Sequence, residues 1–225
     1  GGNAAMMHYH ATPEDHAVLE KKGFLLVDSG ATYMDGTTDI TRTYPLGPLT
    51  EDEKRFYTWT LQSHIDLAKA VWLDYCECKM IDTIAREPLW RHLINYRCGT
   101  GHSVSFVGNV HEGPHALNGR NTTLMRPGMI VTDEPGVYDT DLVGIRIENE
   151  LVCVHKADNQ YGTFLGFEPL MFVPIATSPI LPGVLDKDEI AWLNDYHRQV
   201  FAKLAPHLND EERSWLAEKC AAIGC

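Results

Sequence analysis

The chain lacks any apolar run that approaches the ~20 residues needed to cross a bilayer. It also lacks an amino-terminal leader pattern, because residues 1–10 have neither a basic start nor a long apolar core. Positive charge is scarce: 19 Lys and Arg residues face 31 Asp and Glu residues, and the net charge is −12. We therefore expect no membrane partner and no nucleic-acid partner.

Cysteines with the paired spacing of a zinc site are missing as well. The six cysteines are spread over the chain: Cys76, Cys78, Cys98, Cys153, Cys220 and Cys225. Cys76 and Cys78 are too close together for a zinc pair, and no matching second pair follows. A chain of 225 residues is too large to need disulfide staples. We expect reduced thiols in a cytoplasmic protein.

A starting methionine is also absent, since the chain opens with Gly1-Gly2-Asn3 and runs directly into a strand-like pattern at residues 4–10. Such an opening indicates a piece of a longer chain or a processed chain. The composition is otherwise ordinary, with 44% hydrophobic and 22% charged residues. The length suits one large domain, or one domain with an appendage.

Two apolar, strand-like stretches each hold a carboxylate. Residues 130–136 carry Glu134, and residues 144–149 carry Glu148. A carboxylate in a strand core is costly unless something compensates for its desolvation. These two stretches therefore indicate a site where negative charge is balanced.

Three further candidates, Asp28, Asp39 and His102, lie upstream. Four carboxylates that converge on one point with an imidazole would repel each other, and two divalent cations balance the four negative charges. Two cations close together acidify a bridging water and clamp a carbonyl oxygen, which is the chemistry of a two-metal hydrolase. Carboxylate ligation with a single histidine favours manganese and leaves zinc or cobalt open.

The strand Phe24–Asp28 and the β-branched strand Thr38–Tyr44 predict a hairpin. Pairing of these strands brings Asp28 and Asp39 side by side, where they can share a metal pair. Downstream, the capping box from Thr50 to Glu53 predicts a helix that reaches Leu73, and a second helix is expected at residues 80–94. A long strand is expected at residues 145–154, and two helices near the carboxyl end.

Several motifs, taken in order, resemble the catalytic domain of the aminopeptidase P family, the Xaa-Pro aminopeptidases, and are most similar to the cytosolic-type subgroup. The matching stretches span nearly the whole chain: Met7-His8-Tyr9, Val27–Ala31, Asp35–Thr43, Gly99–His102, Asn109–Pro114, Gly128–Gly136, Gly144–Asn149 and Phe167–Leu170. The resemblance implies the pita-bread fold, an α+β domain with a curved, mainly antiparallel sheet and helices on its outer face. We place the catalytic domain at residues 1–178 and a C-terminal helical extension at residues 179–225.

The resemblance also implies a role for each metal-ligand candidate. Asp28 would hold one metal with both of its oxygens. Asp39 and Glu148 would bridge two metals, most simply manganese, while His102 and Glu134 would complete the second. A bridging water would attack the scissile carbonyl, and Glu134 would take its proton.

Other residues would act around the substrate. His111 would steady the tetrahedral intermediate or the substrate carbonyl, and His8 would lie on the proline side of the pocket. Arg146 and Tyr138 would face the ligands or the substrate. One position departs from the family pattern: Cys98 stands four residues before the ligand histidine, where the family has a histidine. A thiol cannot carry the positive charge of an imidazolium, so this departure bears on recognition of proline or on turnover.

The expected function is a two-metal aminopeptidase that hydrolyses the bond between an N-terminal residue and a following proline, with short peptides as partners. A prolidase-like dipeptidase fits the same scaffold. A non-catalytic pita-bread module that binds peptides or partner proteins is the alternative from another class; the five retained ligands argue against it.

The family fold also begins some tens of residues earlier, so part of the sheet or its helical cover is expected to be missing. The resemblance implies a homodimer through the C-terminal helices, whose apolar faces suit packing on their own domain equally well.

Overall fold

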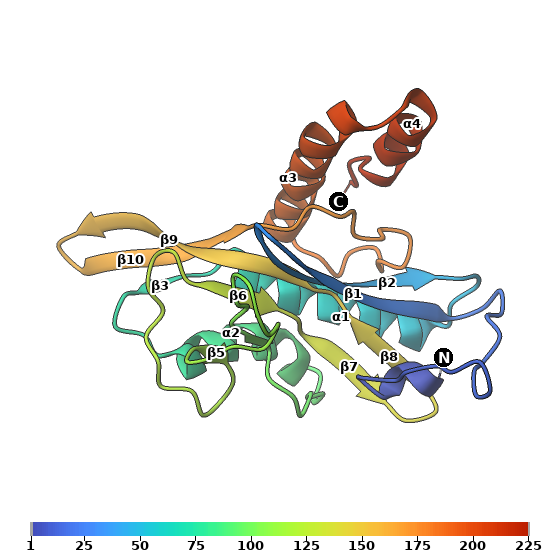
Figure 1. Ribbon diagram of the computed structural model, residues 1–225, viewed down its shortest axis with the longest axis horizontal. Helices are drawn as coiled ribbons and strands as arrows, with labels where there is room; N and C mark the ends of the chain where they lie inside the picture. The colour runs from blue at the N-terminus through green and yellow to red at the C-terminus, as the bar shows by residue number, and fades with distance from the viewer. Residues whose placement is uncertain (1, 225) are drawn as a thin grey trace.

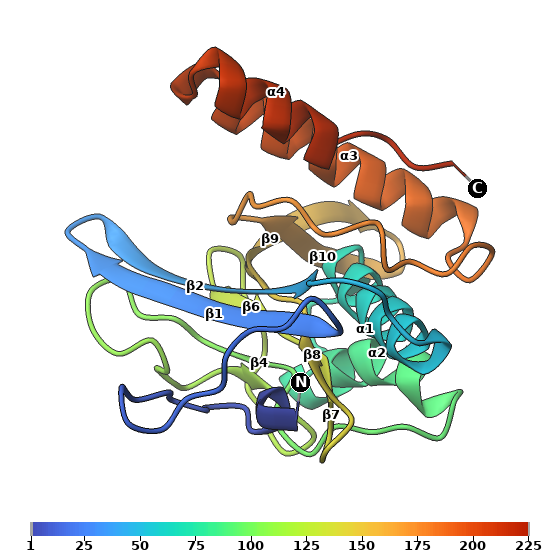
Figure 2. The same ribbon diagram turned by 90° about the vertical axis from the view of Figure 1, so that its right-hand side faces the viewer.

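The computed structural model describes residues 2–224, in which helices α1 and α2 lie on one side of a set of strands and α3 stacks with α4 at one edge (Figures 1 and 2). The helices are α1 (Glu51–Ala68), α2 (Cys78–Trp90), α3 (Lys187–Leu204) and α4 (Asp210–Lys219), with 3-10 turns η1 (Gly2–Ala5) and η2 (Ala205–His207). Gly1 and Cys225, at the outer ends of the two predicted domains, lie outside the described residues.

The described residues form four antiparallel sheets, which confirms the predicted α+β class with antiparallel strands. The sheets are β1 (Phe24–Tyr33) with β2 (Gly36–Pro45); β3 (Val71–Leu73), β10 (Gly162–Pro169), β9 (Asn149–Asn159) and β6 (Ile130–Asp133) in that order; β4 (Gly101–His102) with β5 (Ala116–Leu117); and β7 (Gly136–Asp139) with β8 (Val143–Arg146). Several short sheets, rather than one long sheet, let the strand ends converge from different directions.

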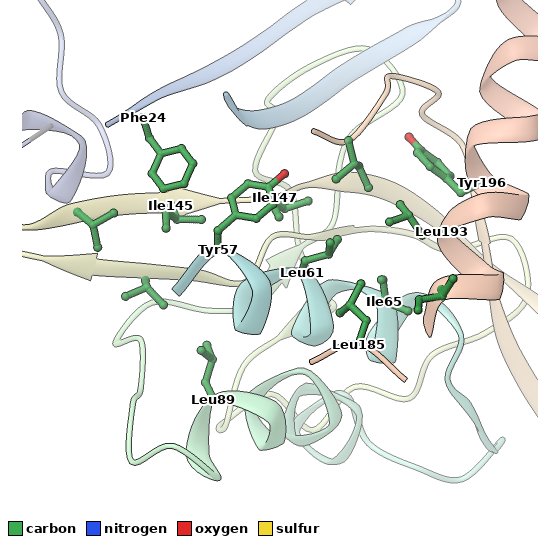
Figure 3. Close-up of a cluster of buried hydrophobic side chains, with 14 of the residues drawn as sticks. Phe24, Tyr57, Leu61, Ile65, Leu89, Ile145, Ile147, Leu185, Leu193 and Tyr196 are labelled. Atoms are coloured by element: carbon green, nitrogen blue, oxygen red, sulfur yellow. The ribbon is translucent and has the colours of Figure 1, made fainter. Parts of the chain in front are cut away.

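Helix α1 begins at the predicted capping box. Thr50 accepts the N–H of Glu53, and the Glu53 carboxylate accepts the N–H of Thr50 at 2.7 Å. Its apolar stripe of Tyr57, Leu61 and Ile65 recurs at helical spacing and is buried. In Figure 3 these side chains lie in a cluster that also holds labelled residues of β8 and α3. The C-terminal helices and the strands therefore share one core through α1.

The predicted hairpin is confirmed as β1 and β2. In its register Asp28 lies opposite Thr41, and Asp39 lies opposite Gly30. The two acids are thus diagonal neighbours on one face of the hairpin, two residues apart, rather than directly opposite each other. An added Cβ at Gly30 would lie 2.5 Å from the carbonyl oxygen of Thr38, so glycine permits this close approach of the strands.

Two helix predictions overran the observed ends. Helix α1 ends at Ala68 rather than Leu73, because residues 71–73 form β3 and pair with β10. Helix α2 ends at Trp90 rather than at residue 94. Its Pro88 lies within the helix and does not break it. Apolar side chains at helical spacing continue past Ala68, so the pattern did not mark the change to a strand.

Two strand predictions were also wrong. The strand predicted at residues 145–154 is broken at Ile147 and Glu148, between β8 and β9. At the break, the N–H of Glu148 donates to the carbonyl of Thr41 in β2 at 3.1 Å, so the chain leaves one ladder before it joins the next. Residues 4–10 form the end of η1, a turn and a loop, and pair with no strand among the described residues.

Two findings concern residues 2–224 as a whole. None of their helices combines the length and apolar character needed to span a membrane. Their five cysteines are free thiols: Cys76, Cys78, Cys98, Cys153 and Cys220.

Candidate active site

Three of the five predicted metal ligands converge at the meeting point of the ladders. Asp39 comes from β2, His102 from β4, and Glu148 from the break between β8 and β9. One ligand atom from each lies within 4.8 Å of the other two, and all three side chains are largely shielded from solvent. A group of two carboxylates and one imidazole at this spacing is able to hold a divalent cation.

Glu134 joins this group directly after β6. Its Oε1 lies 3.2 Å from Nε2 of His102 and accepts the hydroxyl of Thr132 at 2.9 Å. Nε2 of His102 also lies 3.5 Å from Asp39. Burial lowers the pKa of His102, but its hydrogen bonds to Asp39 and Glu134 outweigh burial and raise the pKa to about 10. Without a cation, the imidazole takes a proton to balance these carboxylates.

The backbone of β4 fixes where His102 points. An added Cβ at Gly101 would lie 1.8 Å from the carbonyl oxygen of Thr132, so only glycine allows β4 to lie this close to β6. The N–H of His102 donates to the hydroxyl of Thr132 at 2.9 Å, and its Nδ1 lies 3.1 Å from the carbonyl of Ser103. If Nδ1 donates to that carbonyl, the Nε2 lone pair is left for a metal.

Glu148 provides the test of whether a cation fits here. Its Oε2 accepts the hydroxyl of Thr41 at 2.5 Å, whereas its Oε1 is buried without a hydrogen-bond partner among the described residues. Burial, followed by the negative charges of Glu134 and Asp39, raises the pKa of Glu148 well above its ordinary value. A buried carboxylate that has one unpartnered oxygen and is repelled by two other carboxylates needs positive charge, and a divalent cation supplies it.

Asp28 is placed differently from the other ligand candidates. Its carboxylate accepts from Nη2 of Arg146 at 2.5 Å, and its side chain is 41% exposed. Arg146 also donates to the hydroxyls of Thr41 at 2.9 Å and Tyr138 at 3.0 Å, and its Nε lies 3.9 Å from both Glu134 and Glu148. The predicted ligand Asp28 and the predicted site residue Arg146 thus form an ion pair, which we call the Asp28 half of the centre. The group of Asp39, His102 and Glu148 is the Glu148 half.

The two predicted substrate-side histidines lie at the open side of the group. The His111 ring lies 3.7 Å from the ring of His102, centroid to centroid. Burial and the charge of His102 lower the pKa of His111, so its imidazole is neutral at physiological pH. His8 is exposed in the loop after η1, near enough for its charge to lower the pKa of His111 further.

Cys98 precedes this group in a half-buried position. Arg86 donates to its carbonyl at 2.8 Å, which fixes the backbone. Burial and the charge of Glu134 raise the pKa of the Cys98 thiol. The thiol is therefore neutral, and this position carries no cationic group.

The motifs did not point to several residues that support the ligands. Thr41 and Thr132 bond Glu148 and Glu134 as described above, and Glu150 accepts the N–H of Asp39 at 2.6 Å. Burial raises the pKa of Glu150 to about 7. Thr41 lies two residues from Asp39 on the same face of β2, and Thr132 and Glu150 lie two residues from Glu134 and Glu148, so a search at a spacing of two residues would have found all three.

Comparisons with known proteins agree with this geometry. Residues 1–155 match metallopeptidase family M24, and residues 163–223 match the C-terminal region of peptidase M24. A probable Xaa-Pro aminopeptidase P of Coprinopsis cinerea is 40% identical, over 99% of this chain and 37% of the relative. Aminopeptidase P1 of Lotus japonicus is 42% identical, over 100% of this chain and 35% of the relative. The chain thus spans little more than a third of the length of these relatives.

Solved structures give the same result for the fold. The X-prolyl aminopeptidase from Caenorhabditis elegans, described as a cytosolic enzyme with a di-nuclear active site, superposes with a TM-score of 0.93 at 37% identity, covering 99% of this chain and 37% of that one. Prolidase from Pyrococcus furiosus matches with a TM-score of 0.62 at 27% identity, covering 74% of this chain and 45% of that one. The predicted pita-bread fold is confirmed. The chain belongs to metallopeptidase family M24, as a catalytic domain of the aminopeptidase P type.

Proposed function

We propose that this chain is the catalytic part of a two-metal aminopeptidase that removes an N-terminal residue preceding proline. The observation that carries the proposal is the convergence of Asp39, His102 and Glu148, together with a buried oxygen of Glu148 that lacks a partner among the described residues. Glu134 and Asp28 extend this group on either side. Manganese suits a ligand set with one imidazole and several carboxylates, with zinc or cobalt as the alternatives.

When bound, two divalent cations supply an acidified water and electrostatic stabilisation of the scissile carbonyl oxygen. Glu134 is the residue that takes the proton of the attacking water, because its carboxylate borders the ligand group. His111 is neutral and exposed beside His102, so its N–H is able to donate to the substrate carbonyl. Arg146 orients Asp28 and Tyr138 by two charge-assisted hydrogen bonds.

The substrate assignment follows the relatives. The bond before proline joins a tertiary amide, whose nitrogen has no N–H, so a dedicated pocket is chemically reasonable. The C. elegans X-prolyl aminopeptidase superposes more closely than the prolidase, which favours an aminopeptidase over the prolidase-like dipeptidase. We place His8 on the proline side of that pocket.

Three further assignments belong to the same proposal. A cytoplasmic location is supported by the description of the C. elegans relative as cytosolic. A division near residue 178 separates the strand region from α3 and α4. A homodimer through these helices is the expected assembly, with exposed Trp215 on α4 as the apolar contact that it would cover.

The deciding experiment measures bound metal and cleavage in one sample. The purified chain is loaded with manganese, its metal content is measured by elemental analysis, and an Xaa-Pro peptide is offered as substrate. About two metals per chain with cleavage of the Xaa-Pro bond is the expected result. Two metals without cleavage would favour the peptide-binding module or show that longer relatives supply a needed part. No bound metal under any loading would overturn the two-metal centre.

A further inference from the structure

A buried polar layer lies behind the proposed ligands Glu134 and Glu148. Asp133 and Asn149, their neighbours in the chain, are cross-strand partners at the end of the β6–β9 ladder. Glu134 follows β6 directly and Glu148 precedes β9 directly, whereas the side chains of Asp133 and Asn149 approach His64 of α1. Both residues are fully buried.

His64 of α1 lies between the members of this pair. Its Nδ1 is 3.0 Å from Oδ2 of Asp133 and 3.3 Å from the carbonyl oxygen of the same residue. Its Nε2 is 3.3 Å from Nδ2 of Asn149. The imidazole is fully buried, and the ring of Trp192 meets it edge to face at 5.9 Å between centroids. One side chain therefore bridges the two residues that adjoin the two proposed ligands.

The hydrogen bonds of this layer have a fixed direction. The guanidinium of Arg42 has only donors, and its Nη2 donates to Oδ1 of Asn149 at 2.8 Å. The amide nitrogen of Asn149 then faces His64 and donates to Nε2. Nε2 is thus an acceptor, and the remaining proton of the neutral ring sits on Nδ1, which faces Asp133. Arg42 therefore sets the tautomer of His64 through the orientation of the Asn149 amide.

Arg42 carries the same layer onto the second ligand. Its Nη1 donates to the carbonyl of Glu148 at 2.5 Å and to the carbonyl of Thr41 at 2.9 Å. The backbone at the break between β8 and β9 is therefore fixed from behind, where no ladder holds it. Groups that hold a ligand residue in place without contacting the metal orient the ligand and affect metal affinity.

We propose that His64 is a positioning residue of the metal centre, because it fixes the spacing of Glu134 and Glu148 through Asp133 and Asn149. The proposal rests on the assignment of these glutamates as ligands. His64 itself touches neither metal nor substrate. Its loss should weaken metal binding through a change in the spacing of the ligands, beyond any general loss of stability.

The test compares manganese binding by calorimetry in the wild type and three variants of His64. His64→Leu removes both contacts and should weaken manganese binding by about 10- to 100-fold. His64→Asn places an amide where Nδ1 stood, and His64→Gln places one where Nε2 stood. Each should restore part of the affinity that His64→Leu loses. The exchange coupling of the manganese pair in electron paramagnetic resonance should change in His64→Leu, since it reports metal spacing.

The matched control is His197→Gln. His197 is equally buried, on α3; its Nε2 accepts the N–H of Ile175 at 3.1 Å, and its Nδ1 has no hydrogen-bond partner among the described residues, so its ring bonds neither Asp133 nor Asn149. It should lower the melting temperature with unchanged manganese affinity. Equal weakening in His197→Gln and His64→Leu would overturn the positioning role, since general damage to the core would explain both. Unchanged affinity in all three His64 variants would overturn it too, with the metal centre intact. A wild type that binds no manganese would overturn both proposals together.

Discussion

Asp28 and Glu148 are two carboxylates of one centre in opposite electrostatic situations. Asp28 is partly exposed and bonded to the guanidinium of Arg146, so the protein itself balances its charge. Glu148 is almost completely buried, lies 3.9 Å from the same guanidinium, and has one oxygen without a partner among the described residues. The two halves of the centre therefore differ in their need for a cation: the Asp28 half is balanced by the protein, and the Glu148 half is not.

This difference has a consequence for metal loading. A cation at the half formed by Asp39, His102 and Glu148 relieves repulsion and displaces only the protons that the raised pKa values of His102 and Glu148 favour. A cation at Asp28 competes with Arg146 for the same oxygen. The two metals should therefore bind with unequal affinity, the tighter one at the Glu148 half.

Glu134→Gln should have the largest effect, since Glu134 touches both halves: it lies 3.2 Å from His102 and 3.9 Å from Arg146. The substitution keeps the shape of the side chain and removes the proton acceptor. We expect kcat for an Xaa-Pro peptide to fall by about 10²- to 10⁴-fold. Circular dichroism should show an unchanged fold, and Glu112→Gln, in an exposed loop, serves as the control. Full activity in Glu134→Gln would remove this residue from the mechanism.

Glu148→Gln and Asp28→Asn should have opposite effects on the metal-free protein. The raised pKa of Glu148 means that its contribution to the stability of the metal-free fold is largest below the ordinary pKa of glutamate and is lost as pH rises through the raised value. Glu148→Gln removes that loss, so its metal-free melting temperature should exceed the wild-type value at neutral pH. Its affinity for manganese should fall at the same time, because a bridging ligand is lost.

Asp28→Asn leaves the buried guanidinium of Arg146 with one partner fewer. Because Asp28 is 41% exposed, the loss of stability should be modest, about 1 kcal/mol or less. Thermal unfolding of both variants after chelator treatment, from about pH 5 to pH 8, measures the contrast. A metal-free Glu148→Gln that is less stable than the wild type throughout would show that Glu148 needs no cation.

Cys98→His should have the smallest effect and should raise activity. The neutral thiol beside Glu134 cannot donate as an imidazolium does, so a histidine there should increase turnover of Xaa-Pro peptides by up to about tenfold. Cys76→His is the matched control, since Cys76 is a half-buried thiol packed against the other hydrophobic cluster. Equal turnover in Cys98→His and the wild type would make the family departure neutral.

The site residues were predicted from the sequence more accurately than the strand boundaries were. Glu134 and Glu148 stand out because a carboxylate in an apolar strand needs a reason, and the structure brings Glu148 together with Asp39 and His102. The break at Ile147 was not predictable from its side chain, because the pattern on both sides reads as one strand. His64 was missed for a related reason: it lies between the apolar positions Leu61 and Ile65 of α1, and only the tertiary structure shows what it contacts.

Because the proposed ligands come from separate parts of the strand structure, bound metal reports whether all of these parts are in place. Asp39, His102 and Glu134 come from three different ladders or their ends, and Glu148 comes from the gap between two. Among the described residues no pair of neighbouring strands carries or adjoins more than two of the proposed ligands, so the full set cannot form until contacts distant in sequence are made, which is slow to achieve in folding. Opening of any one ladder should release metal before the whole domain unfolds. The rate at which a chelator strips manganese from the native protein then measures local opening that global unfolding experiments do not detect.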